Sequence, residues 1–224
     1  MKTTRTTAIV LRRTDYGEAD RIVQLLTPEG RFSVMARGVR RPKSKLAGGI
    51  ELLSVSDVVL GEGKGDLGIL TSARSKIFFA HIMEDYDRLQ FGYYAIKQIA
   101  KASEHVNEPD WYDILVEVLA GLDALSLPLS LVETWFYLRV ASTLGHSLNL
   151  SADVDGDKLL AEEIYRYDIG ERGLRLDSNG EITADHIKLL RLVSTKSLKV
   201  LSQVGGLSET LPQARQIARA HAAL

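Results

Sequence analysis

The first 80 residues alternate short apolar stretches with turn residues, which is the pattern of β-strands. Each stretch is rich in Val, Ile, Leu or Thr and is bounded by turn-forming residues such as Gly, Pro and Asp. The five stretches cover residues 4–13, 19–27, 31–39, 50–60 and 67–72. Five short strands bury little apolar surface as a flat sheet, whereas a closed barrel removes their exposed edges. The pattern therefore predicts a small β-barrel.

Alternation along the third stretch predicts which side chains point into this barrel. One face of the strand carries Phe32, Val34 and Ala36, and the other carries Arg31 and Arg37. Successive side chains of a strand point to opposite faces. We therefore expect Phe32 in the barrel core and not on a base-stacking surface, and we expect both arginines to project outward.

Two of the expected strands, at residues 8–11 and 22–26, are apolar on both faces. A strand whose outer face meets water normally carries polar residues there. Part of the outer surface of the barrel should therefore be covered by another segment.

From residue 81 onward, apolar residues recur at the spacing of helices. Helices are expected at residues 86–105, from 107–109 to about 126, and at 129–144, 184–204 and 212–223. Thr183 is the expected N-cap of the fourth helix. Residues 164–176 alternate weakly around two glycines, which fits a β-hairpin or an irregular connection. The expected fold is α+β, with a five-stranded barrel in residues 1–78 followed by an all-helical domain in residues 79–224.

The composition narrows the class of protein. Apolar residues make up 45% and charged residues 25%, as in ordinary globular domains, and cysteine is absent. The chain therefore has no disulfide, thiol nucleophile or cysteine-ligated metal. Its N-terminal apolar run of four residues is too short for a signal peptide, and no run approaches the roughly 20 residues that span a bilayer. We expect a soluble, cytoplasmic protein without membrane association.

The net charge of −1 conceals an uneven distribution. Basic and acidic residues number 14 and 8 in residues 1–80, 8 and 19 in residues 81–182, and 6 and 2 in residues 183–224. Residues 30–50 contain no acidic residue and six basic ones, namely Arg31, Arg37, Arg40, Arg41, Lys43 and Lys45. Such a block can bind phosphates, or it can be a solvated loop that protects a strand edge from aggregation. The charge pattern leaves both interpretations open.

The sequence lacks the usual catalytic motifs. It contains no nucleophile elbow, no H-E-x-x-H pair and no dinucleotide-binding fingerprint. The glycine-rich stretch at residues 61–66 joins two expected strands, so a hairpin turn fits it better than a phosphate loop, which leads into a helix. The five histidines are scattered and show no metal-ligand spacing. We expect a protein that is not an enzyme and that holds no cofactor or metal.

An ordered series of motifs runs through the chain. It consists of AIVL (8–11), YGE (16–18), DRIV (20–23), TPEG (27–30), ARGVRR (36–41), KSKL (43–46), YY (93–94), LG (144–145) and YRY (165–167). The series resembles the RecO family, bacterial recombination mediators of DNA repair. The resemblance is specific in order and spacing over residues 5–70, and beyond them it rests mainly on the order of helices.

The resemblance implies an N-terminal OB-fold and a helical C-terminal domain packed against it. It implies a mediator that binds single- and double-stranded DNA and anneals complementary strands. With RecR as a partner, such a protein loads RecA onto strands covered by single-stranded DNA-binding protein (SSB), and it binds the acidic C-terminal tail of SSB. Its location would be the cytoplasm, in association with the nucleoid. Many members carry a four-cysteine zinc motif, but residues 149–180 here have no cysteine, so this degenerate region must be held by packing and hydrogen bonds.

A sequence-tolerant binder of single strands combines a basic groove with flat side chains. The expected DNA-binding residues are Arg31, Arg37, Gly38, Arg40, Arg41, Lys43 and Lys45, with Arg12, Arg13 and Arg5 as a second group. Gly38 either lets the backbone approach a phosphate or forms the exit turn of the strand. Tyr16 is either a stacking aromatic or a packing lid. Basic residues near the C-terminus could extend the path, namely Lys188, Arg191, Lys196, Lys199, Arg215 and Arg219.

Trp135 and Arg139 lie one helical turn apart and form the candidate notch for the SSB tail. The alternative is that Trp135 belongs to the core between helices. The acidic middle block should repel DNA and leave its surface free for protein partners. Two other functions stay open, a protein-binding adaptor with a structural barrel and an OB module that binds RNA.

Overall fold

The computed structural model describes residues 3–65, 67–106, 108 and 110–222. The chain forms two compact units, Met1–Asp123 and Ala124–Leu224, which we call the barrel unit and the hairpin unit. The barrel unit continues past residue 78, because the first two α-helices pack with the barrel.

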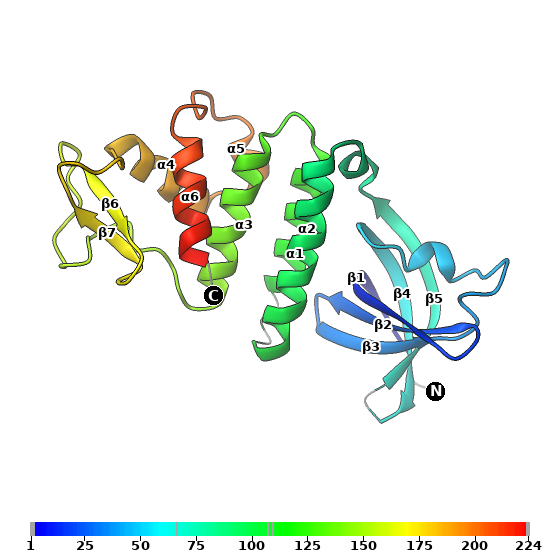
Figure 1. The fold of residues 1–224 in the computed structure, drawn as a ribbon. Coiled ribbons are helices and arrows are strands. Elements are labelled where there is room, and N and C mark those ends of the chain that lie inside the picture. Colours follow the sequence, from blue (N-terminus) through cyan, green and yellow to red (C-terminus); the bar gives the residue numbers. More distant parts are fainter. Residues whose placement is uncertain (1–2, 66, 107, 109, 223–224) are drawn as a thin grey trace. The chain divides into compact units, whose positions relative to one another are not determined.

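Five strands form a closed barrel in the barrel unit (Figure 1). They are β1 (Thr3–Tyr16), β2 (Asp20–Thr27), β3 (Gly30–Ala36), β4 (Ser54–Lys64) and β5 (Leu67–Phe78). Their order is β1-β2-β3-β5-β4, and β1 pairs with both β2 and β4, which closes the sheet. The β3–β5 pair is parallel and the others are antiparallel. The predicted five-stranded barrel, an OB-fold, is confirmed.

The barrel core follows the predicted alternation except at one position. Val34 and Ala36 are buried together with apolar residues from the other strands. Phe32, on the same face, is 38% exposed, so its predicted place in the core is wrong. It is the first inward position after Gly30, where β3 begins, and it lines a hollow at that end of the barrel. Strand alternation predicts the direction of a side chain, but it does not predict whether other side chains cover it at that end of the barrel.

Two helices cover part of the outer surface of the barrel. The chain leaves β5 through the 3₁₀ helix η2 (Ala80–Glu84) and continues into α1 (Tyr86–His105) and α2 (Asp110–Asp123). Asp85 caps α1 by accepting hydrogen bonds from two backbone N–H groups. α1 contacts β1 and α2 contacts β2, and the outward-facing Ile9 and Leu26 are buried. The Tyr112 hydroxyl donates to Thr7 Oγ1 at 2.8 Å. This cover explains why both strands are apolar on both faces.

The predicted helix at 86–105 agrees with α1. The predicted start of the second helix at residues 107–109 includes two positions outside the described residues.

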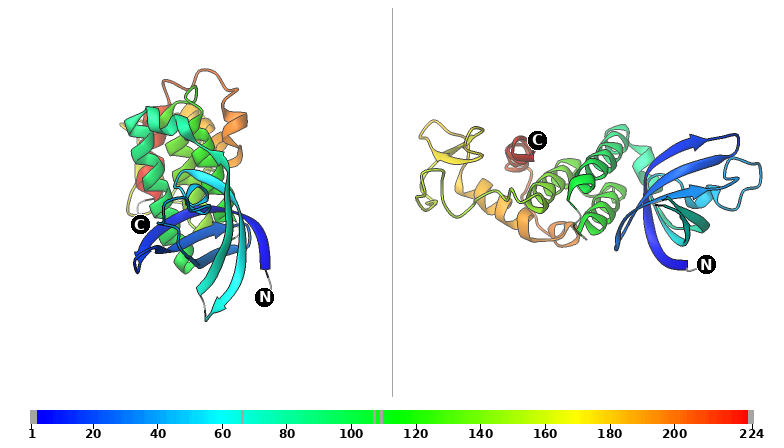
Figure 2. Two further views of the ribbon diagram at one scale, coloured as in Figure 1. Left: turned by 90° about the vertical axis from the view of Figure 1, so that its right-hand side faces the viewer. Right: turned by 90° about the horizontal axis from the view of Figure 1, so that it is seen from below.

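The hairpin unit combines helices with one small sheet (Figure 2). Its elements are α3 (Leu129–Thr143), β6 (Tyr165–Asp168), β7 (Gly173–Leu176), α4 (Ala184–Thr195), α5 (Leu198–Leu201) and α6 (Leu211–Ala222). α3 packs against α4 and α6. The prediction of an all-helical domain is wrong at residues 164–176, where β6 and β7 form an antiparallel β-hairpin. The hairpin was one of the two interpretations of that segment.

The long helix predicted at residues 184–204 is interrupted. α4 ends at Thr195, Lys196 is extended, and the Ser197 side chain caps the short helix α5. The Lys196 carbonyl accepts hydrogen bonds from Trp135 Nε1 at 2.9 Å and Arg139 Nη2 at 3.1 Å. The helix ends here because two donors on α3 hold that carbonyl, a contact that local periodicity does not contain.

Candidate nucleic-acid interface

The segment after β3 is fixed against the turn between β1 and β2. Arg40 N donates to Ala19 O at 2.9 Å, and Gly38 N donates to Asp20 Oδ1 at 2.6 Å. Gly38 has φ of 63°, in the left-handed region that glycine adopts without a steric cost. In this structure Gly38 therefore forms the exit turn, and its N–H group is already bonded.

The residues after this turn, 37–45, form an exposed surface that we call the basic loop. Arg37, Arg41, Lys43 and Lys45 are exposed, and none has a carboxylate at ion-pair distance in the described part of the chain. Arg40 is held more firmly than these four, because its Nε lies 3.5 Å from Asp15 Oδ2 and its Nη1 donates to Gly17 O. The loop thus presents a cluster of positive charges that contains no carboxylate of its own.

Asp15 beside Arg40 is itself held by another strand residue. Arg21 Nε donates to its carboxylate at 2.8 Å, and this hydrogen bond keeps the pKa of Asp15 below its ordinary value. The carboxylate therefore stays ionised and anchors Arg40 at the base of the basic loop.

A hollow of about 490 Å³ lies beside the basic loop. Its lining residues come from the end of β1, the start of β2, the end of β3 and the β4–β5 hairpin, namely Tyr16, Asp20, Met35, Arg37, Glu62, Gly63, Leu67, Gly68 and Ile69. Tyr16 is 55% exposed. OB-folds bind oligonucleotides on the face of their second and third strands and at the loops that border this hollow. The hollow thus lies beside loops of the kind that bind ligands in OB-folds.

A second hollow of about 500 Å³ shares Glu62, Gly63 and Gly68 with the first and contains Phe32. Phe32 and Met35 line these hollows but lie outside the set of site residues predicted from the sequence. The available signal was the position of Phe32 two residues after the turn glycine Gly30, where the strand is only beginning.

The remaining predicted cations of the barrel unit divide into paired and free ones. Arg31 projects outward as predicted, but its Nη1 donates to Ala100 O at 3.0 Å and its Nη2 lies 3.3 Å from Glu104. Arg13 pairs with Glu51 at 2.8 Å. Arg12 and Arg5 are exposed, without an ion-pair partner among the described residues. The free cations are therefore concentrated in the basic loop, whereas Arg31 binds α1 and helps to fix that helix on the barrel.

In the hairpin unit, Trp135 is 2% exposed, and Arg139 lies over its ring at 5.3 Å from the centroid. Trp135 thus lies in the core between helices, which is the alternative interpretation, and it does not line an exposed notch. Of the predicted C-terminal cations, Arg215 pairs with Glu133 at 3.0 Å and Arg191 Nε donates to Leu150 O at 2.9 Å. These arginines connect elements of the hairpin unit.

The cysteine-free segment is held by ion pairs around β6 and β7. Arg175 lies 2.9 Å from Asp168 and 3.0 Å from Asp155, and Arg166 lies 3.2 Å from Asp177. The hydrogen bond between Asp168 and Arg175 lowers the pKa of the carboxyl and raises that of the guanidinium. Within the described ranges no three His, Asp or Glu side chains could share a metal ion. The residues here do not fit the zinc site that the family resemblance implied.

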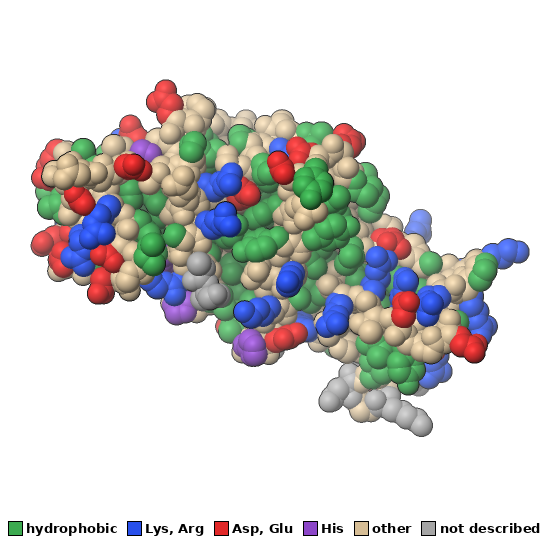
Figure 3. Space-filling view, viewed as in Figure 1, with side chains coloured by type: hydrophobic (Ala, Val, Ile, Leu, Met, Phe, Trp, Pro, Cys, Tyr) green, Lys and Arg blue, Asp and Glu red, His purple; other side chains and the backbone are tan. Residues whose placement is uncertain are grey.

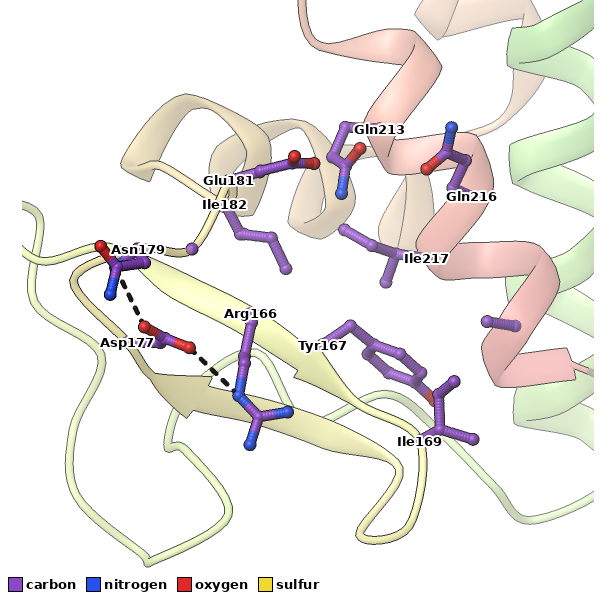
Figure 4. A pocket seen from close by; sticks show the side chains of 12 residues that line it. Arg166, Tyr167, Ile169, Asp177, Asn179, Glu181, Ile182, Gln213, Gln216 and Ile217 are labelled. Carbon is purple, nitrogen blue, oxygen red and sulfur yellow. Dashed lines mark hydrogen bonds and ion pairs between the residues drawn. The ribbon is translucent and has the colours of Figure 1, made fainter.

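A hollow of about 380 Å³ lies between this hairpin and α6. Figure 4 shows the side chains that line it. Arg166 points along the hairpin toward Asp177, and the amides of Gln213 and Gln216 extend from α6. Such a lining can hydrogen-bond a ligand. Among the described residues, no helix has both the length and the apolar character to cross a membrane.

Two family models match the chain. "Recombination protein O N terminal" matches residues 1–78, and "Recombination protein O C terminal" matches residues 83–222. Together they cover nearly all of the barrel and the helical region.

Curated relatives give the same result. DNA repair protein RecO of Roseiflexus sp. (strain RS-1) is 34% identical over 73% of this chain and 57% of its own length, and that of Heliobacterium modesticaldum is 37% identical over 69% and 56%. DNA repair protein RecO of Dehalococcoides mccartyi (strain CBDB1) is 28% identical over 89% of this chain and 81% of its own. The chain thus spans little more than half the length of the first two relatives. With both family models matched, this chain belongs to the RecO family of DNA repair proteins.

Proposed function

We propose that the protein binds single-stranded DNA along the outer face of β3 and the basic loop. The observation that carries this proposal is the cluster of exposed cations, free of ion pairs with described carboxylates, beside the hollow that contains Tyr16 and Arg37. Figure 3 shows Lys and Arg side chains gathered over the barrel. Cations along a groove bind the phosphates, and an exposed ring stacks on a base.

Binding in this mode is tolerant of sequence. The cations contact phosphates, which are the same at every nucleotide, and a tyrosine ring stacks on any base. In this proposal the protein makes and breaks no covalent bond, and it acts by holding a strand for a later step. The acidic side chains that follow α1, between residues 108 and 182, oppose binding of DNA on their own surface.

The cellular role proposed here is that of a recombination mediator in the cytoplasm, on the nucleoid. It includes binding of double-stranded DNA, annealing of complementary strands, and loading of RecA with RecR onto SSB-covered strands. Membership of the RecO family supports this role. The SSB tail is a proposed partner on the same ground. Trp135 offers the tail no exposed ring, and its Nε1 donor is bonded to Lys196.

The test is binding of a fluorescent single strand by the full chain at low and high salt, followed by annealing of complementary strands coated with SSB. The proposal expects binding that weakens steeply with salt, by about 0.7 log units of affinity per log unit of salt for each phosphate contact. It also expects faster annealing than without the protein. Absence of binding at low salt would favour a protein-binding adaptor. Preferred competition by a matched RNA strand would favour an RNA-binding module.

A further inference from the structure

One exposed stripe of α1 carries aromatic rings at its N-terminal half and lysines at its C-terminal half. Its residues are Tyr86, Gln90, Tyr93, Lys97 and Lys101, and all five are exposed. Steps of three and four residues place side chains on one helix face. The opposite face of α1 carries the buried Phe91, Ala95, Ile96 and Ile99. Packing against the rest of the barrel unit therefore accounts for one face of α1 and leaves the tyrosine–lysine stripe without a structural role.

The rings and ammonium groups of this stripe are accessible. Tyr86 is 73% exposed and Tyr93 is 44% exposed. No ion pair holds Lys97 or Lys101 in the described part of the chain. Tyr94 differs, because its ring packs on Phe91 at 5.5 Å between centroids.

The stripe begins where the outer face of β3 ends. Arg31 at the start of β3 donates to the carbonyl of Ala100 and pairs with Glu104, so its side chain links the last turns of α1 to that strand. Lys97, Lys101 and Glu104 follow each other at four and three residues, so both lysines lie on the side of α1 that reaches Arg31. Along β3, the residues facing outward run from Arg31 through Ser33 and Met35 to Arg37. The outer face of β3 thus connects the basic loop with the lysines of α1.

The dimensions suit a strand of nucleic acid. The stretch from Arg31 to Arg37 is about 20 Å long at 3.3 Å per residue. The stripe from Lys101 to Tyr86 adds about 22 Å at 1.5 Å per residue. Figure 3 shows hydrophobic side chains along the face of α1 turned to the viewer.

We propose that this stripe is a second single-strand binding segment, and that it continues the DNA path of the barrel. Lys101 and Lys97 bind phosphates of the strand as it leaves β3, and Tyr93 and Tyr86 stack on the bases that follow. The positive charge of the lysines and the flat tyrosine rings are the two features that sequence-tolerant single-strand binders combine. This inference rests on the proposed function, because it extends the same strand beyond the barrel.

The test compares a short oligothymidine of about 6 nucleotides, which the barrel face can hold, with a long one of about 20 nucleotides. We expect K97Q/K101Q to lower the salt slope for the long strand by about 1.4 and to leave the slope for the short strand unchanged. Gln keeps the helix propensity and removes the charge. A variant without the ring faces, Y86L/Y93L, should weaken binding of the long strand by about fivefold or more for each base that loses its ring. Y86F/Y93F keeps the rings and should bind like the wild type.

Two controls separate a local effect from a general one. K76Q/K158Q removes the same charge from exposed positions outside the stripe, and it should leave the slope for the long strand unchanged. Photocrosslinking of a long strand that carries iodouracil should label Tyr86 or Tyr93. Unlabelled tyrosines, together with wild-type binding of both strands by K97Q/K101Q and Y86L/Y93L, would overturn the inference and leave the barrel site intact. That outcome would favour a protein as the occupant of the stripe. Failure of the wild type to bind either strand would instead overturn the proposed function, and the inference with it.

Discussion

The basic loop and the β6–β7 hairpin use the same kind of residue for opposite purposes. In the basic loop, Arg37 and Arg41 are exposed and no described carboxylate pairs with them. In the hairpin, Arg166 and Arg175 each contact two aspartates. An arginine is available to an anionic partner only where the fold leaves it without a carboxylate, so a count of basic residues does not locate a DNA surface.

The hairpin needs its aspartates for a structural reason. Arg166 and Arg175 are directly opposite each other in the strand register, and like charges at such positions destabilise a sheet. Asp168 lies within ion-pair distance of both and separates the two charges. The positive charges of the hairpin are therefore neutralised by aspartates within the fold, whereas those of the basic loop are not.

The largest effect is expected for a residue that joins the parts of the hairpin unit. Trp135→Ala removes a buried ring and the donor to Lys196 O, and it should lower the free energy of unfolding by about 3–5 kcal/mol. Denaturant unfolding measures this loss. Single-strand affinity of the folded fraction should not change. Lost affinity at full stability would contradict the division of roles between the two units.

The next effect concerns the basic loop. R37A/R41A/K43A/K45A should lower the salt slope of single-strand binding by about 2.8 if each side chain contacts one phosphate. Affinity should fall equally for all sequences, because phosphates carry no sequence information. Fluorescence anisotropy over a salt series measures both quantities. The matched double variant R166Q/R175Q should lower the melting temperature and leave the slope unchanged. An unchanged slope in the loop variant would place the DNA path elsewhere.

A smaller effect is expected from the geometry of the loop. Gly38→Ala places a side chain at φ of 63°, which costs about 1–2 kcal/mol in a left-handed conformation. The new Cβ would lie 3.6 Å from Arg41 Cδ, so strain and not collision is the cause. Denaturant unfolding should show a modest loss of stability, and binding assays should show a lower affinity for single-stranded DNA. Gly48→Ala, with open space around the new Cβ and no positive φ, is the matched control.

The smallest expected effect is a difference between the two units in how their stability depends on pH. His221 is buried, its Nδ1 lies 2.9 Å from the Tyr167 hydroxyl, and burial lowers its pKa below 6.5. The unfolded chain binds this proton more readily, so the hairpin unit should lose stability as the pH falls below 6.5. His81 pairs with Asp123, whose hydrogen bond raises the pKa of His81 above 6.5. The folded chain holds this proton, so the barrel unit should lose stability as the pH rises above 6.5.

Melting curves of H221Q and H81Q between about pH 5 and 8 measure these two contributions. Each variant should flatten only the limb of the stability profile that its own histidine produces. A loss of the acid limb in H81Q would show that the assignment of histidines to units is wrong.

Much of the fold followed from local patterns. Turn residues and apolar stretches located all five barrel strands, and helical spacing located α1 with its ends. Strands apolar on both faces indicated a cover, which α1 and α2 supply. The basic loop was found because no acidic residue interrupts it, and it stays a predicted site until binding is measured.

The errors share a physical cause. Phe32 has the parity of a core residue but lies where the barrel opens, and residues 184–204 have helical spacing but are broken at Lys196. In each case a part of the fold that is distant in the sequence decides the outcome. For Phe32 it is the open end of the barrel, and for Lys196 it is the pair of hydrogen-bond donors on α3.

The sequence by itself determined the strands, the helices, the order of the units and the membership of a family, because these depend on periodicity, turn chemistry and ordered motifs along the chain. Tertiary structure alone decided which cations are free. Arg31 and Arg37 are equivalent in strand parity, yet Arg31 meets the carbonyl of Ala100 on α1, whereas Arg37 faces solvent beside a hollow. The availability of a charge depends on which groups the fold brings within a few ångströms of it, and those groups lie far away in the sequence.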